Sequence, residues 1–188
     1  MEQSGMAECK PCVTPMEERL KLMKDSTAAK VDATLYRSIV GGLRYLVHTR
    51  PDIAFAVGYV SRFMEDPRED HWAAVKRLLR YVKGTVNHGI IFPKTGGSRL
   101  QLTVFSDADM AGDIDGRRGT SGILVFLGSA PISWLSLKQK VVALSTCEAE
   151  YVAAATAACK ADRCGSSPTS TDGGQPARHR PHKESDSP

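Results

Sequence analysis

The chain has 188 residues, of which 41% are hydrophobic, and this is enough for one domain with a small neighbour. Its net charge of +4 and pI of about 8.8 fit contact with nucleic acid, but many unrelated proteins share such a balance. No apolar run approaches the ~18 residues of a membrane span, and residues 1–16 contain no apolar signal-peptide core. We therefore expect an intracellular protein, cytoplasmic or nuclear, that makes no membrane contact and keeps its five cysteines as thiols.

The first half of the chain is predicted to be helical. Residues 1–31 show little apolar patterning and are interpreted as a linker, whereas residues 32–86 carry three helical patterns. Pro51 begins the second pattern, Pro67 ends it, and Gly84 ends the third. The residues expected to face inward are Leu35, Ile39, Leu43 and Leu46 in the first helix, Ile53, Val57, Val60 and Met64 in the second, and Trp72, Val75, Leu79 and Val82 in the third.

Residues 87–161 change to patterns that are typical of strands. Apolar and polar residues alternate over 100–104, which predicts a first strand. The near-continuous apolar run 122–127 favours a buried second strand after a polar loop at 113–120. A third strand with a charged middle is expected over 131–144.

A last helix is predicted to begin near Ser145. Ser145 and Glu148 have the spacing of a capping box, in which each side chain bonds a backbone N–H of the first turn. Alanines continue the helix through Ala158. Residues 165–188 contain no Leu, Ile, Val, Phe, Trp, Tyr or Met, so residues 162–188 are expected to form a disordered tail.

Six segments carry motifs in a fixed order along the chain. They are 36–46 (YRSIVGGLRYL), 49–53 (TRPDI), 71–84 (beginning HW), 106–113 (SDADMAGD), 131–134 (PISW) and 143–151 (ALSTCEAEY). Together they resemble copia-type retrotransposon Pol polyproteins over roughly residues 6–161, although Met110 stands where that family usually has tryptophan. The resemblance implies the C-terminal connection of a reverse transcriptase followed by the N-terminal half of a ribonuclease H domain.

The chemistry that this resemblance implies is hydrolysis of the RNA strand of an RNA–DNA hybrid. Two Mg²⁺ ions about 4 Å apart would clamp the attacking and leaving oxygens, and carboxylates are suitable ligands for them. By the same resemblance, Asp107 at the end of the first strand and Glu150 on the last helix are the first two catalytic acids and metal ligands. The implied partners are an RNA–DNA hybrid and the remainder of a polyprotein.

The resemblance stops before the ribonuclease H domain is complete. Related domains place a third acid on a strand beyond the helix, and nothing after Glu150 resembles that segment. Codons that specify residues 163–170 can encode, in another frame, an apolar run like the continuation of the family's helix. We hypothesise that a frameshift near Lys160 replaced the native C-terminal half, which sequencing of the gene tests, and we expect the domain to be inactive alone.

The predicted fold class is therefore α/β of the α+β kind. It consists of a helical connector, an incomplete ribonuclease H-like sheet with three strands and a packed helix, and a disordered C-terminal tail. Asp109 and Asp113 are interpreted as acids that organise the loop, because aspartates readily bond nearby backbone N–H groups. Cys147 and Cys159 are expected to be small core residues.

A basic helix offers an alternative function. Lys76, Arg77, Arg80 and Lys83 either contact the phosphates of a hybrid or form a solvated face. A non-enzymatic nucleic-acid-binding module would use this helix together with the loop 113–120. A non-functional translation product that folds poorly is the third possibility.

Overall fold

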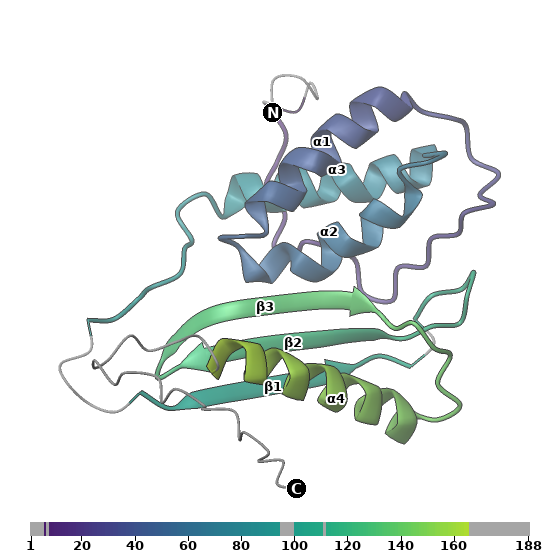
Figure 1. Cartoon of the computed structure of the whole chain (residues 1–188). Helices are drawn as coiled ribbons and strands as arrows, with labels where there is room; N and C mark the ends of the chain where they lie inside the picture. The colour runs from purple at the N-terminus through teal and green to yellow at the C-terminus, as the bar shows by residue number, and fades with distance from the viewer. Residues whose placement is uncertain (1–5, 7, 95–99, 111, 166–188) are drawn as a thin grey trace, which may run out of the picture.

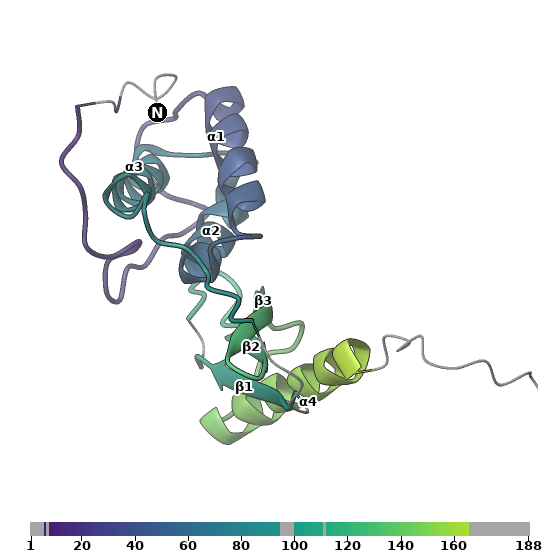
Figure 2. The ribbon, with the colours of Figure 1, turned by 90° about the vertical axis from the view of Figure 1, so that its left-hand side faces the viewer.

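The computed structural model describes residues 6, 8–94, 100–110 and 112–165, which form a layer of helices beside a small sheet (Figure 1). The helical layer contains α1 (Ala33–Leu46), α2 (Ala54–Val60) and α3 (Glu69–Gly84), with 3₁₀ turns at Pro51–Ile53 and Ser61–Phe63. The sheet contains β1 (Leu102–Ala108), β2 (Thr120–Leu127) and β3 (Ala130–Lys138), and α4 (Thr146–Gly165) covers one face of it. Figure 2 shows that the helical layer borders the β3 edge of the sheet, whereas α4 lies on a face. The predicted order of helices followed by a three-stranded sheet with a packed helix is confirmed.

The first helix begins where the sequence predicts, but its buried face is wider than predicted. Asp32 caps α1, since its side chain accepts hydrogen bonds from the Thr34 and Leu35 amides at 2.8 and 3.2 Å. Leu43 is buried as predicted, and Ile39 and Leu46 are partly buried against the core. The fully buried residues, however, are Tyr36 and Val40, which the prediction omits. Tyr36 can be buried because its hydroxyl donates to the Val60 carbonyl at 2.9 Å.

The motif at 49–53 makes a polar corner between α1 and α3. The buried Arg50 guanidinium donates two hydrogen bonds to Asp52, at 2.9 and 2.7 Å, and two to Thr85, at 3.0 and 2.6 Å. Tyr81 donates its hydroxyl to the same Asp52 carboxylate at 2.9 Å. These hydrogen bonds lower the pKa of Asp52, although its partial burial opposes them. The corner therefore fixes the start of the second helical segment against the end of α3.

The sheet is antiparallel, with the order β1-β2-β3. Asp107 pairs with Gly122, and Gly122 pairs with Ser136, so the three strands are in register at the end where β1 finishes. The tight β2–β3 connection uses Gly128 at φ +61, a left-handed conformation that a glycine adopts without strain. The prediction of a strand over 131–144 is wrong at its end, because β3 stops at Lys138 and the chain turns towards α4.

Ser145 caps the last helix as predicted, whereas Glu148 bonds an amide that precedes the first turn. The Ser145 hydroxyl accepts from the Glu148 amide at 3.1 Å, and the Glu148 carboxylate accepts from the Leu144 amide at 2.7 Å. The helix continues to Gly165, so residues 162–165 are helical and their assignment to a disordered tail is wrong. The rest of the predicted tail, 166–188, lies outside the described residues.

The two layers have separate cores. The helical layer buries Tyr36, Ile53 and Leu78 completely and also takes in Met6 and Leu22 from the N-terminal segment. The cluster beneath α4 is smaller, and its buried members are Ile123, Val125 and Ala157. Cys147 and Cys159 are exposed, so their prediction as core residues is wrong: the sheet-facing stripe of α4 passes through Ala149, Ala153 and Ala157 instead. Among the described residues, no helix is long and apolar enough to cross a membrane.

Candidate functional site

Asp107 lies on β1, on the face of the sheet that α4 does not cover. Leu102 and Val104 pack into the cluster beneath α4, and successive strand residues point to opposite faces. Phe105 and Asp107 therefore point the other way. The Asp107 side chain is exposed and makes no hydrogen bond or ion pair with the described residues.

Glu150 lies in the first turns of α4, at the same end of the sheet. The Gln139 side-chain amide donates to Ser121 at 3.0 Å and to the Ala149 carbonyl at 2.9 Å, and this bridge holds the start of α4 against the sheet. Ser121 is the β2 partner of Ala108. Glu150 is therefore next to the bridged Ala149, and Asp107 is next to the β1 residue that pairs with the bridged Ser121. The Glu150 side chain is exposed and, within the described part of the chain, unpaired.

The two carboxylates do not form a closed metal centre. They occupy the same end of the sheet but start from opposite sides of β1. The described residues contain no group of three or more His, Cys, Asp or Glu side chains placed to hold a metal ion. Two carboxylates have the oxygen donors that Mg²⁺ prefers, but a pair of ions needs more ligands than these two side chains supply. Asp107 and Glu150, with the rest of the residues that the structure describes, therefore do not fit a two-magnesium site.

The loop that follows Asp107 is organised by its own acids, as predicted. The Asp109 carboxylate accepts a hydrogen bond from the Thr120 amide, and the Asp109 amide donates to the Thr120 carbonyl at 3.1 Å. Gly119 is required beside them, because a Cβ there would lie 2.1 Å from the Asp109 carbonyl oxygen. Asp109 is thus committed to backbone interactions next to Asp107.

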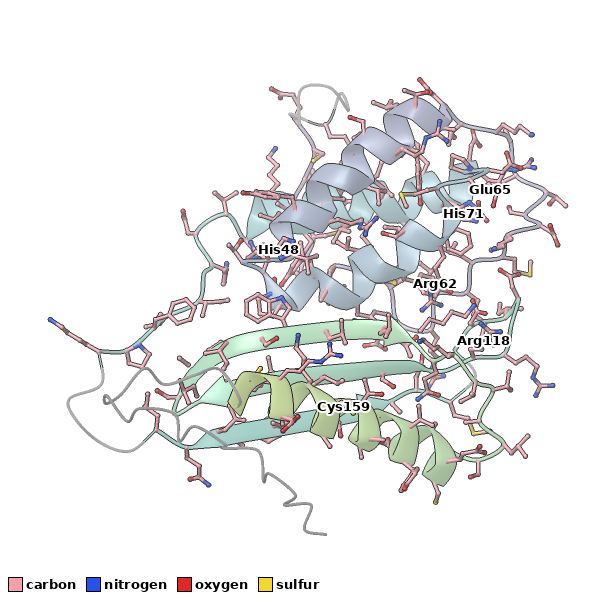
Figure 3. The ribbon with its side chains drawn as sticks, in the orientation of Figure 1. His48, Arg62, Glu65, His71, Arg118 and Cys159 are labelled. Atoms are coloured by element: carbon pink, nitrogen blue, oxygen red, sulfur yellow. The ribbon has the colours of Figure 1, made fainter. Side chains whose placement is uncertain are left out.

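Asp113 joins the loop to the helical layer. Its buried carboxylate accepts from the Gly116 amide at 2.7 Å, pairs with Lys138 of β3, and lies 3.4 Å from a guanidinium nitrogen of Arg62. Arg62 also donates to the Thr120 hydroxyl at 3.0 Å. Figure 3 shows Arg62 at the junction of the two layers. Burial raises the pKa of Asp113, but the hydrogen bonds from Lys138 and Gly116 and the charges of Lys138 and Arg62 outweigh it, so this pKa lies below its ordinary value.

Neither cation of this junction was recognised from the sequence. Arg62 follows an apolar helical run, and Lys138 ends an apolar strand. A charged residue directly after a buried element is the sequence signal that could have indicated a buried ion pair. The separation of 51 residues between Arg62 and Asp113 leaves no local spacing that would pair them.

A cavity of about 410 Å³ opens beside Asp107, between the sheet and the start of the second helical segment. Phe55 from α2, Phe105 from β1 and Trp134 from β3 are among its lining residues, together with Asp107 and Asp109. Trp134 also ties the two layers, because its indole N–H donates to the Val47 carbonyl at 2.7 Å. The exposed carboxylate of Asp107 therefore borders an aromatic cavity.

The basic residues of α3 hold the N-terminal segment. Arg77 pairs with Glu17 at 2.9 Å, Arg80 donates to the Lys10 carbonyl at 2.7 Å, and Lys83 donates to the Cys9 carbonyl at 2.9 Å. The Lys76 ammonium lies 5.7 Å from the centre of the Trp72 ring. These interactions account for where the four side chains lie, and their contact with nucleic acid stays a prediction.

Comparison with known proteins relates this chain to transposon polyproteins. It is 48% identical over 151 residues to a retrovirus-related Pol polyprotein from transposon RE2 of Arabidopsis thaliana, which covers 80% of this chain and 10% of that protein. It is also 48% identical over 161 residues to the corresponding polyprotein from transposon TNT 1-94 of Nicotiana tabacum, with 82% and 12% covered. A secreted RxLR effector protein of Plasmopara viticola is 50% identical over 119 residues, which are 63% of this chain and 82% of that protein. No protein-family model and no solved structure matches the chain.

These similarities establish the class of protein. The chain is homologous to a segment of copia-type retrotransposon Pol polyproteins. It spans about a tenth of the length of the Pol polyproteins that it matches.

Proposed function

We propose that residues 32–86 derive from the connection after a reverse transcriptase and residues 87–161 from the front half of a ribonuclease H domain. In this proposal Asp107 and Glu150 are the first two acids of a centre that hydrolysed RNA in RNA–DNA hybrids. The observation that carries the proposal is the position of these two unpaired, exposed carboxylates at one end of the sheet. Homology to Pol polyproteins supports it.

The same arrangement supports the expectation that this chain does not cleave RNA by itself. The described residues offer two acids where a pair of Mg²⁺ ions needs three or four, and fewer ligands lower both metal affinity and the accuracy of its geometry.

The test is Mg²⁺-dependent cleavage of the RNA strand in a labelled RNA–DNA hybrid by the full 188-residue chain. We expect wild type, Asp107→Asn and Glu150→Gln to leave the hybrid intact. Asp109→Asn is a matched control, because its carboxylate organises the loop and not the proposed centre. Cleavage by wild type that Asp107→Asn and Glu150→Gln abolish would overturn the expected inactivity and mean that a further acid completes the site.

The alternative is a non-enzymatic module that binds nucleic acid through Lys76, Arg77, Arg80 and Lys83. Hybrid affinity would then fall steeply as salt concentration rises, since each phosphate contact releases counterions. Arg77, Arg80 and Lys83 would first have to leave the N-terminal segment. Lys76→Glu with Arg80→Glu would weaken the affinity for the hybrid, and it would also remove the hydrogen bond from Arg80 to the Lys10 carbonyl.

A further inference from the structure

A second groove lies on the opposite face of the sheet from Asp107, between α4 and β3, with a volume of about 760 Å³. We call it the α4–β3 groove. Its apolar walls include Leu137, Val141, Tyr151, Val152, Ala155 and Cys159. Leu137 is 46% exposed and Tyr151 is 77% exposed, so the groove is open to solvent. Figure 3 labels Cys159 on α4, which forms one wall.

The α4 helix has apolar or small residues on two sides. One stripe, which includes Ala149 and Ala153, is buried against the sheet. A second stripe, which includes Ala155 and Cys159 at a spacing of four residues, faces the groove and is exposed. A helix with apolar residues beyond a single stripe is usually covered on more than one side. The small side chains of the second stripe also permit close approach of another helix.

The rim of the groove is basic. Lys138, Lys140, Lys160 and Arg163 line it, and no Asp or Glu does among the described residues. Lys138 is paired with Asp113, whereas the other three side chains make no hydrogen bond or ion pair within the described part of the chain. The groove therefore combines apolar walls with uncompensated positive charge.

We propose that the α4–β3 groove binds an acidic amphipathic helix of a partner protein. The wall from Tyr151 to Arg163 extends about 18 Å at about 1.5 Å per residue, which matches three turns of a partner helix. Such a helix would place apolar side chains on Leu137 and Val152 and acidic side chains beside Lys160 and Arg163. This inference is independent of the proposed ribonuclease H origin.

Two other occupants fit the groove less well. A nucleic-acid backbone satisfies the basic rim but presents no aliphatic surface for the apolar walls. Residues 166–188 contain no Leu, Ile, Val, Phe, Trp, Tyr or Met, so the chain's own terminus has no apolar side for this groove. Charge complementarity and the apolar walls together favour an acidic amphipathic helix.

The probe is a fluorescent peptide of about 12 residues with leucines at i, i+3, i+4 and i+7 and glutamates beside them, and as a helix it has about the length of the wall. Binding to the full chain is measured by anisotropy. One matched peptide carries lysine in place of glutamate, and another carries serine in place of leucine. We expect only the first peptide to bind, with affinity that falls as salt rises.

Two substitutions in the groove test its location. Lys160→Glu with Arg163→Glu is expected to weaken binding about tenfold or more, and Cys159→Asp is expected to weaken it by a similar factor because it places a charge on the apolar wall. Lys21→Glu with Lys24→Glu changes the net charge equally but lies outside the groove, so it should leave affinity unchanged. Circular dichroism checks that each variant is folded.

The proposal is overturned if the lysine peptide binds as well as the glutamate peptide, or if the Lys160 and Arg163 reversal has no more effect than the control pair. It is also overturned if the glutamate peptide fails to bind while an RNA–DNA hybrid binds, and the Lys160 and Arg163 reversal abolishes binding of the hybrid. The rim would then be a nucleic-acid surface. None of these readouts depends on RNA cleavage, so they leave the ribonuclease H proposal untouched.

Discussion

The helical layer and the sheet layer reach very different degrees of burial. The helical layer completely buries large side chains such as Tyr36, Ile53 and Leu78, and it supports them with a buried polar corner at Arg50. The sheet layer completely buries Val125, but Phe105 on its other face is 58% exposed. Within the described residues, strand β1 also pairs with another strand on one side only. The helical layer therefore buries its large apolar side chains well, whereas the sheet layer leaves apolar side chains exposed on one face.

This difference predicts where stability resides. Burial of apolar surface is the main favourable term in folding, so a layer with larger buried side chains resists opening more strongly. Two exposed grooves, one on each side of the sheet, leave apolar surface in contact with water.

The largest expected effect comes from a matched pair of leucine truncations. Leu78→Ala in α3 removes a fully buried side chain and should lower the free energy of unfolding by about 3 kcal/mol or more, whereas Leu135→Ala, at a half-buried position of β3, should cost less than about 2 kcal/mol. Urea denaturation measures both. Equal losses would show that the two layers share one core and would remove the contrast.

Arg50→Leu tests the polar corner of the helical layer. It removes the buried partner of Asp52 and Thr85, so we expect a loss of about 2–3 kcal/mol in unfolding free energy. Arg37→Leu is the control, because Arg37 is exposed and makes one bond to the Met64 carbonyl, and it should change stability by about 0.5 kcal/mol or less. If the two variants are equally stable, the corner is only a surface interaction.

Asp113→Asn tests the junction between the layers. The pKa of Asp113 is lower in the folded protein than its ordinary value, so the ionised form stabilises the fold above the unfolded-state pKa of about 4. That contribution is lost as pH falls through the lower folded-state pKa. We expect the variant to lose about 2 kcal/mol at pH 7 and to converge with wild type towards pH 2, as measured by urea unfolding at both values.

Asp66→Asn provides the comparison for that pH dependence. The pKa of Asp66 is also lowered, chiefly by a hydrogen bond from Arg68, but its carboxylate lies at the surface. Its substitution should therefore change stability much less at either pH. A pH profile of Asp113→Asn that parallels wild type down to pH 2 would contradict the assigned role of Asp113.

The sequence predicts local features better than their partners. The helical start at Pro51 and the cap at Ser145 follow from proline and capping geometry, which act over a few residues. The predicted inward face of α1 correctly includes Leu43 but omits Tyr36, whose hydroxyl can be buried only because it donates to a carbonyl 24 residues away. The third strand was extended too far because Val141 and Val142 continue its apolar pattern while lying half in solvent.

In the candidate site, too, the sequence predicts the local elements but not the contacts between them. The sequence placed Asp107 near the end of a strand and Glu150 on a helix, and both elements are present. The positions of Asp107 and Glu150 relative to each other depend on the Gln139 bridge and on which face of β1 packs against α4. Neither feature follows from spacing along the chain. Arg62 was missed for the same reason, since its partner Asp113 is distant in sequence.

The smallest expected effect concerns the start of α4. Ser145→Ala removes the side chain that accepts the Glu148 amide and should lower stability by about 1 kcal/mol. Because α4 packs on the sheet and not on the helical layer, hydrogen exchange should accelerate in α4 and β1 while α1 and α3 stay unchanged. Thr146→Ala is the matched control at the adjacent helix position, because its side chain makes no bond to the described residues. Faster exchange in α1 and α3 as well would mean that the two layers open as one unit, despite the difference in their cores.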